Sequence, residues 1–201
     1  MRITAVEPRR KGLSQLYIDG ECALKLDTET LLLNGIKAGT EITDEELHEL
    51  VEKSEARRAS EKALYLLEHR SHSKKELRDK ISKVTSKEAA AAAAQHMEDI
   101  GLVNDGEFAR MYAREMFERK KFGAARVKQE LYMKGIDRDV IDAVIEEYVV
   151  APDENIRFIL EKKYRGYHED EKIKRRAVAG LQRLGYRFDD IRRAMKIEEE
   201  Y

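Results

Sequence analysis

The chain has 201 residues, of which 39% are charged and 7% aromatic, and its formal net charge is −1. Two prolines and an abundance of Lys, Glu, Arg and Leu predict a mainly α-helical protein. No apolar run approaches the roughly 20 residues of a membrane span, and no apolar stretch typical of a secretory signal follows the first residue. The single cysteine, Cys22, excludes an internal disulfide and a multi-cysteine zinc site. We therefore expect a cytoplasmic monomer with no membrane partner.

The charge is unevenly distributed along the chain. Residues 1–52 carry six Lys/Arg and eleven Asp/Glu, whereas the rest carries 33 basic and 29 acidic residues. Basic residues are most concentrated at 57–83, 110–134 and 162–193. An acidic N-terminal region followed by a basic body indicates a polyanion or an acidic protein surface as the partner.

The N-terminal region predicts a β-hairpin. Apolar residues alternate with polar ones on both sides of Asp19-Gly20-Glu21. A two-residue turn would pair Ile18 with Glu21. A three-residue loop would pair Ile18 with Cys22 and Leu16 with Leu24, and we favour it because it keeps one face apolar. Cys22 would then be a small buried side chain. Residues 3–6 predict a third strand that ends at Pro8.

A capping box, Thr43-x-x-Glu46, predicts the start of a helical stretch that runs to about His69, as one helix or as two. Further helix starts are indicated by Ser73-x-x-Glu76, by Thr85-x-x-Glu88 and by Asn104. Gly135 and Gly185 stand where helices need a left-handed C-terminal residue. The six alanines at 89–94 add little bulk to a core, so we expect Met97 and Ile100 to anchor their helix.

The helical part of the chain repeats with an offset of 50 residues. Residues 121–145 align without a gap with 171–195, and the aligned pairs include Val127 with Ala177, Leu131 with Leu181, Gly135 with Gly185, Ile136 with Tyr186, and Ile141 with Ile191. A weaker copy places Leu77 and Ile81 at the positions of Val127 and Leu131. Another helix precedes each copy, at 54–69, 105–120 and 153–164.

This pattern predicts three three-helix repeats, at 53–103, 104–151 and 152–201, after the acidic region 1–52. The expected fold is mainly α, with tandem three-helix repeats in an elongated curved array and a small N-terminal region that contains a β-hairpin. Neighbouring repeats in such an array bury each other's faces.

No catalytic constellation of usable specificity is present. The sequence has no phosphate-binding Gly-x-x-x-x-Gly-Lys loop, no Gly-x-Gly-x-x-Gly and no His-Glu-x-x-His. The five histidines are scattered, and the capping box at Ser73 separates His69 from His72. We therefore expect a protein that is not an enzyme and has no metal and no cofactor.

Three basic clusters stand near equivalent points of the three repeats. A loop followed by a helix N-terminus and flanked by cations is a plausible anion site. The candidate binding residues are Arg70, Lys74 and Lys75 in the first repeat, Arg119, Lys120, Lys121, Arg126 and Lys128 in the second, and Lys174, Arg175 and Arg176 in the third.

The alternative interpretation of these clusters is a solvated helix surface with i,i+4 ion pairs. The aromatic residues nearby are expected in cores or between repeats rather than stacked on bases; they are Tyr112, Phe117, Tyr132, Phe158, Tyr164 and Tyr167.

Three stretches of the chain resemble the RecX family of recombination regulators. They are Ala63-Leu64-Tyr65-Leu66-Leu67-x-x-Arg70-Ser71-x-Ser73-x-x-Glu76-Leu77, Gly101-Leu102-Val103-Asn104-Asp105-x-x-Phe108-Ala109-Arg110-x-Tyr112, and Phe122-Gly123-x-x-Arg126-Val127-x-x-Glu130-Leu131-x-x-Lys134-Gly135-Ile136. The resemblance implies a fold of tandem three-helix units. It also implies a modulator that binds the filament of RecA on single-stranded DNA and suppresses ATP hydrolysis, strand exchange and repressor cleavage.

Two other functions stay open at this point. A helix-turn-helix DNA-binding protein would need a base-reading set on a recognition helix, and the second helices here carry mainly charge. A helical scaffold for an acidic protein partner would need no DNA at all. Salt-dependent binding to single-stranded DNA would separate the scaffold from the others, and a footprinted sequence preference would identify the helix-turn-helix protein.

Overall fold

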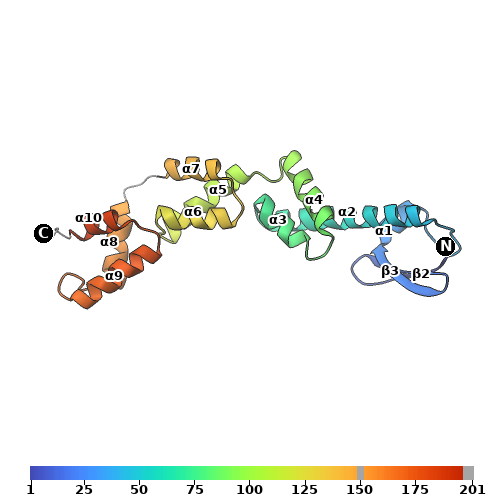
Figure 1. Cartoon of the computed structure of the whole chain (residues 1–201), viewed down its shortest axis with the longest axis horizontal. Helices are drawn as coiled ribbons and strands as arrows, with labels where there is room; N and C mark the ends of the chain where they lie inside the picture. Colours follow the sequence, from blue (N-terminus) through green and yellow to red (C-terminus); the bar gives the residue numbers. More distant parts are fainter. Residues whose placement is uncertain (149–151, 197–201) are drawn as a thin grey trace. The chain divides into compact units, whose positions relative to one another are not determined.

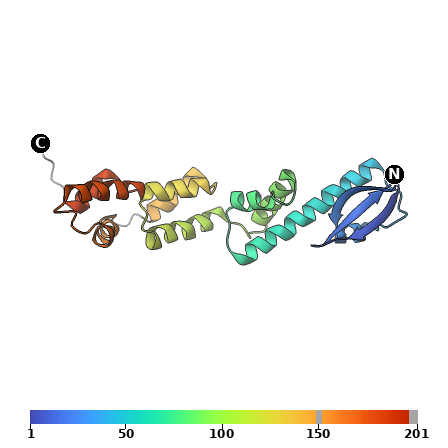
Figure 2. The same ribbon diagram turned by 90° about the horizontal axis from the view of Figure 1, so that it is seen from below.

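The computed structural model describes residues 1–148 and 152–196, in two compact units, Met1–Val103 and Asn104–Tyr201 (Figures 1 and 2). The predicted fold class is confirmed: the chain is mostly helical, with three-helix groups and a small N-terminal sheet. The repeat boundaries given above stay a prediction. Within the described residues, no helix is both long and apolar enough to cross a membrane.

The sheet consists of β1 (Ile3–Pro8), β2 (Leu13–Ile18) and β3 (Glu21–Asp27), antiparallel in the order β1-β2-β3. The predicted third strand and its end at Pro8 are confirmed. The predicted three-residue loop is wrong, because Ile18 pairs with Glu21 across a two-residue turn. Asp19 and Gly20 both have positive φ, at 50° and 88°, which suits a turn that follows the twist of the strands.

Because of a register shift after this turn, each of the two alternative registers is correct at one pair of residues. Tyr17 pairs with Cys22 and Leu16 pairs with Leu24, so one extra residue is accommodated in β3. The irregularity leaves Leu16 and Leu26 buried but turns Cys22 outward, so the prediction of a buried Cys22 is wrong.

The sheet packs against α1 (Thr28–Leu33) and the first half of α2 (Asp44–His69). Ile3, Leu16 and Leu26 share a core with Leu31 of α1 and Leu50 of α2. The predicted capping box is confirmed: Thr43 Oγ1 accepts from the Glu46 N–H at 3.2 Å, and Glu46 Oε2 accepts from the Thr43 N–H at 2.9 Å. Helix α2 is unbroken to His69, so it joins the sheet to the first three-helix group (Figure 2).

The first group consists of the second half of α2 with α3 (Lys74–Ile81) and α4 (Lys87–Asp99). The expected anchoring of α4 is wrong in part, because Ile100 is 52% exposed while three alanines of the run are buried with Met97. Ala59 and Ala63 of α2 belong to the same core. Small side chains on both helices let them approach closely, so the alanines contribute to the core together with Met97 despite their small volume.

Ser73 caps α3 as predicted, with its side chain accepting from the Glu76 N–H. The predicted cap of α4 is wrong by one residue: Ser86 Oγ accepts from the Ala89 N–H at 3.3 Å, while Thr85 Oγ1 lies against the Ile81 carbonyl at 3.4 Å. Thr85 bonds back to the preceding helix and is not available as a cap.

The second unit holds two three-helix groups. One comprises α5 (Asp105–Arg114), which Asn104 caps and the π-helix η1 (Glu115–Arg119) continues, with α6 (Ala124–Met133) and α7 (Arg138–Glu147). The other comprises α8 (Pro152–Lys163), α9 (Glu171–Arg183) and α10 (Phe188–Met195).

The predicted 50-residue offset is reproduced in the two cores. Val127 and Leu131 are buried in one, and their counterparts Ala177 and Leu181 are buried in the other. Gly135 and Gly185 follow the second helices with φ of 80° and 91°, as predicted for left-handed C-terminal residues.

Candidate nucleic-acid interface

The basic residues of the first group form ion pairs inside their own unit. Arg70 donates to both carboxylate oxygens of Glu76, at 2.8 and 3.1 Å. Lys74 Nζ lies 2.6 Å from Gln95 Oε1 and 2.6 Å from Glu98 Oε2, which joins α3 to α4. Lys75 is exposed. Two of the three predicted binding residues therefore already bind carboxylates of the same unit.

Several predicted residues of the second unit are also paired. Arg126 binds Glu130 at 2.6 Å, Lys128 binds Asp142 of α7 at 2.6 Å, and Arg119 binds Glu115. Lys174 and Arg175 lie 3.6 and 3.8 Å from Glu171. The alternative of a surface with short-range ion pairs therefore describes part of these clusters correctly.

Three predicted residues differ from the rest. Lys120, Lys121 and Arg176 form no ion pair with any described residue. Lys120 and Lys121 belong to the loop between η1 and α6, and Arg176 lies exposed on α9. These cations can bind a phosphate without first breaking an ion pair with a carboxylate.

The loop that carries Lys120 and Lys121 has an irregular backbone. The Lys120 N–H donates to the Glu115 carbonyl five residues earlier, at 3.2 Å, and the Phe122 N–H donates to the Met116 carbonyl at 3.1 Å. Lys121 has a φ of 55°, in the left-handed region that residues with a side chain seldom occupy. Wide helical turns and strained single residues are frequent at functional sites.

Contacts with the third group hold this loop in place. Tyr186 donates its hydroxyl to the Lys121 carbonyl at 2.8 Å, and the Gly123 N–H donates to the Leu184 carbonyl at 2.8 Å. A Cβ on Gly123 would lie 2.3 Å from the Gly185 carbonyl oxygen, so the two backbones touch. Burial raises the pKa of Tyr186 to about 12, and its hydroxyl therefore stays protonated as a donor.

Aromatic rings lie beside the cations at this point. Phe158 of α8 is 48% exposed, with Lys121 Nζ 5.8 Å and Lys162 Nζ 5.6 Å from its ring centroid. Phe122 is partly buried, with Lys120 Nζ at 6.0 Å and the Arg126 guanidinium carbon at 5.8 Å. We call these residues the junction patch: Lys120, Lys121, Phe122, Arg126, Phe158 and Lys162.

The expectation that all six aromatic residues serve packing is confirmed in part. Tyr112 and Phe117 pack on one core of the second unit, and Tyr164 and Tyr167 pack on the other. Phe158 and Tyr132 are 48% and 73% exposed, so the expectation is wrong for both. Helical periodicity could not decide this for Phe158, because it stands between the buried Ile156 and Ile159. Lys162 was not among the predicted residues either.

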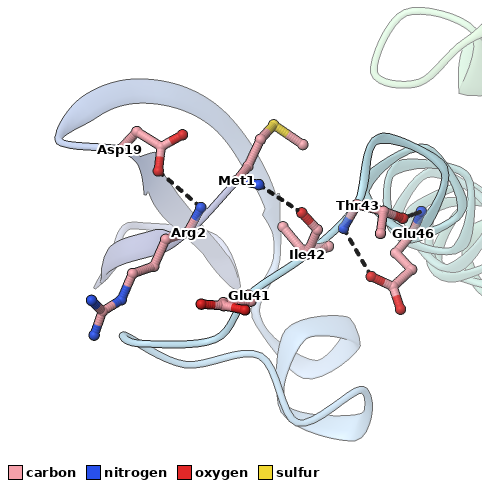
Figure 3. Close-up of a pocket in the computed structure, with 7 residues that line it drawn as sticks. All are labelled: Met1, Arg2, Asp19, Glu41, Ile42, Thr43 and Glu46. Atoms are coloured by element: carbon pink, nitrogen blue, oxygen red, sulfur yellow. Dashed lines mark hydrogen bonds between the residues drawn. The ribbon is translucent and has the colours of Figure 1, made fainter.

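The structure also has a hollow in the first unit, lined by Met1, Arg2, Asp19, Glu41, Ile42, Thr43 and Glu46 (Figure 3). Two of its carboxylates accept hydrogen bonds from backbone N–H groups: Asp19 accepts from the Arg2 N–H at 2.9 Å, and Glu46 accepts from the Thr43 N–H. The acidic lining does not suit a polyanion, and no predicted binding residue lies there. Among the described residues, no three His, Cys, Asp or Glu side chains gather as metal ligands would.

Comparison with known proteins gives consistent matches. Family models of the second and third three-helix domains of RecX match residues 104–145 and 152–195. A protein named regulatory protein RecX from Caldanaerobacter subterraneus subsp. tengcongensis is 31% identical over 98% of this chain and 100% of its own length. One of the same name from Clostridioides difficile is 27% identical, over 96% of this chain and 93% of its own.

Solved structures agree at the level of the fold. A crystal structure of regulatory protein RecX aligns with a TM-score of 0.67 at 21% identity, over 98% of this chain and 99% of that one. A RecX structure from Lactobacillus salivarius aligns with a TM-score of 0.62 over 71% of this chain and 95% of that one. Together with the family models and the relatives, these matches show that the chain belongs to the RecX family of regulatory proteins.

Proposed function

We propose that this protein is a non-enzymatic regulator that binds the filament of RecA on single-stranded DNA. It modulates, mostly by inhibition, the filament's ATP hydrolysis, strand exchange and coprotease activity in recombination, DNA repair and the SOS response. Membership of the RecX family supports the regulatory role, and the relatives named above are regulatory proteins.

The observation that carries the proposal is the junction patch. Lys120 and Lys121 form no ion pair with described residues, and they stand on a loop whose backbone is bonded to the third group. A loop whose backbone is already fixed pays no further cost of backbone ordering when a phosphate binds, so more of the electrostatic gain appears as affinity. Binding of this kind releases counterions and weakens steeply with salt.

The remaining predicted residues of the second unit extend the surface with weaker contacts. Arg126, Lys128 and Lys174 would have to exchange a carboxylate for a phosphate, whereas Arg176 would not. Several weak contacts along one strand add up through effective concentration, provided that the strand reaches them together. This distribution suits a regular filament better than a single short DNA site.

The experiment that tests the proposal is a titration of RecA ATP hydrolysis on single-stranded DNA with this protein. We expect hydrolysis to fall at far less than one molecule per RecA protomer, because one bound molecule affects a stretch of filament. If inhibition required enough protein to coat the DNA, competition for the naked strand would replace filament binding as the explanation. Unchanged hydrolysis at an excess of the protein would refute the regulatory proposal.

Two further measurements separate the alternative functions. A scaffold for an acidic protein would not bind single-stranded DNA, whatever the salt concentration. A helix-turn-helix protein without a recombinase partner would leave RecA hydrolysis unchanged and would protect a preferred duplex sequence in a footprint. The proposed regulator binds single strands without sequence preference.

A further inference from the structure

We infer that Phe158 is a stacking platform for a base of single-stranded DNA, and that Lys121 and Lys162 bind the phosphates on either side of that base. The inference rests on the proposed function, because that function makes single-stranded DNA the ligand. It adds the chemistry of recognition: contact with the base, in addition to contact with the backbone.

The exposure of Phe158 is the first argument. Its neighbours Ile156, Ile159 and Leu160 are buried and complete the core of the third group, so Phe158 contributes little to that core. A single exposed apolar side chain is ordinary. What distinguishes Phe158 is that two ammonium groups, 5.8 and 5.6 Å from its centroid, come from different three-helix groups.

Phe188 provides a comparison within the same unit. It is 51% exposed at the start of α10, and no cation lies over its ring among the described residues. Exposure of a phenyl ring on this unit therefore does not by itself bring lysines to it. The pair of lysines at Phe158 is a local property of the junction patch.

The chemistry of these three side chains matches one nucleotide. Every base presents a π-face that stacks on an aromatic ring without regard to sequence, and positively charged side chains follow the backbone beside it. Exposed cation–π contacts are weak, so a base can displace an ammonium group from the ring. The displaced lysine then meets the phosphate attached to the same nucleotide. In duplex DNA the bases are already stacked, so the site prefers single strands.

The backbone around Lys121 places it for this role. Its left-handed conformation directs the chain from η1 toward α6, and Tyr186 of the third group holds its carbonyl at 2.8 Å. The contact between Gly123 and Gly185 brings the two groups together at the same point. Tyr186 is thus a positioning residue, and the stacking site depends on the junction between the two groups.

The absence of tryptophan from the sequence allows a direct test. Phe158→Trp introduces a single tryptophan at the platform, and Phe188→Trp introduces one at the matched control position; red-edge excitation selects either indole over the nine tyrosines. We expect a twenty-nucleotide oligo-dT to quench the fluorescence at position 158 strongly and at position 188 little. Equal response at both positions would overturn the inference.

Affinity measurements separate stacking from phosphate binding. The wild-type protein should bind oligo-dT about five- to tenfold more tightly than an abasic strand of the same length, since about fivefold is the lower end of what stacking of one base on an aromatic ring contributes. Phe158→Leu should abolish this preference and Phe158→Tyr should retain it, whereas Phe188→Leu should leave it unchanged. Circular dichroism verifies that each variant keeps its helices.

The outcomes decide the inference independently of the proposed function. If Phe158→Leu keeps the preference for oligo-dT, or if the wild-type protein binds neither strand, the stacking site is refuted. The titration of RecA hydrolysis with the wild-type protein decides the regulatory proposal in either case. If only RecA-coated DNA distinguishes Phe158→Leu from the wild type, Phe158 contacts the recombinase and the assignment to a base is wrong.

Discussion

The first three-helix group and the junction patch are both rich in basic residues but use them differently. In the first group, Arg70 and Lys74 bind carboxylates and join the helices of their own unit. In the junction patch, Lys120 and Lys121 lie beside aromatic rings and form no ion pair with described residues. Counting cations along the sequence treats these two regions as equivalent, and the partners that surround each cation show that they are not.

The difference has a physical consequence for binding. A cation paired with a carboxylate must lose that partner to bind a phosphate, so its net contribution to affinity is small. A lysine near an aromatic ring loses only a weak cation–π contact and keeps its full charge for the ligand. We therefore expect binding to depend on the junction patch and stability to depend on the paired residues of the first group.

Reversing charge in the junction patch should have the largest effect. With Lys120, Lys121 and Arg126 all changed to Glu, single-strand affinity should fall by roughly a hundredfold, because each of the two lysines without an ion pair contributes on the order of 1.5 kcal/mol and Arg126, already paired with Glu130, adds little. The salt dependence should also weaken, by about 0.7 in the log–log slope for each lost phosphate. Titrations at several salt concentrations measure both quantities.

The matched control changes the same amount of charge elsewhere in the second unit. Arg138, Arg165 and Arg187 are exposed and lie outside the junction patch. Their combined reversal to Glu should lower affinity much less, through the long-range field alone. Equal losses from the two triple variants would mean that net charge, rather than the junction patch, determines binding.

Forcing apart the contact between the second and third groups should have the next largest effect. Gly123→Ala places a methyl group 2.3 Å from a carbonyl oxygen of the backbone, and neither backbone can move without opening the junction. Overpacking of this kind costs about 1–3 kcal/mol of the free energy of unfolding. Urea denaturation measures that loss, and oligo-dT binding should weaken in the same variant.

Gly106→Ala is the control for this substitution. A Cβ at Gly106 would lie 3.3 Å from Asn104 Oδ1 and 3.9 Å from an Arg110 side-chain nitrogen, so a shift of a few tenths of an ångström suffices and the Asn104 cap of α5 is kept. The free energy of unfolding should then change by less than about 1 kcal/mol, with the helix propensity of alanine in its favour. If Gly123→Ala proved as mild as Gly106→Ala, the close junction would not exist in solution.

Much of the fold could be predicted because its signals are local. A capping box needs residues only three apart, as at Thr43, and a left-handed helix end needs only the glycine, as at Gly185. The offset of 50 residues is also visible without knowledge of contacts. The hairpin at Asp19 shows the limit, since a bulge further along the strand changes which alternative register is correct.

The candidate site was harder to predict because it depends on contacts across the chain. Lys74 forms its ion pair with Glu98, 24 residues away, so no pattern of adjacent charges reveals that this cation is already paired. Gly123 contacts Gly185 of the third group, which lies far along the chain, so no local pattern in the sequence reveals that contact. The exposure of Phe158 follows from how α8 packs, which periodicity between two isoleucines cannot decide.

Removing a paired cation from the first group should produce a smaller effect, and one of a different kind. Lys74→Met keeps most of the apolar length of the side chain but loses the ammonium group that joins α3 to Glu98 of α4. The free energy of unfolding should fall by no more than about 1 kcal/mol, as for other partly exposed pairs. Oligo-dT affinity should stay within about twofold of the wild type. A large loss of affinity with unchanged stability would assign Lys74 to the binding surface instead.

Acidification should reveal the last and smallest difference, again in the first group. His72 is buried between the end of α2 and α3, with Nδ1 2.8 Å from the Arg70 carbonyl and Nε2 2.9 Å from Lys80 Nζ. Nδ1 can donate only as N–H, so Nε2 of the neutral ring accepts from the ammonium group. Burial is the main cause that lowers the pKa of His72, and the positive charges of Arg70 and Lys80 lower it further, against the opposing effects of the hydrogen bond to the Arg70 carbonyl and of the Glu76 carboxylate.

The sign of the pH dependence follows from linkage. The stabilisation from neutral His72 is complete above the unfolded pKa of about 6.5 and is lost as the pH falls through the lower folded pKa, because the unfolded chain binds the proton more tightly. His72→Gln keeps a polar side chain without a titrating group, so its urea midpoint should decline less than that of the wild type between roughly pH 7.5 and pH 5, the range around that pKa. Parallel declines would show that other groups cause the acid sensitivity. A decline confined to the wild type would assign the acid sensitivity to His72 in the first group, where charged residues contribute to stability. Oligo-dT binding at the junction patch would then depend on salt.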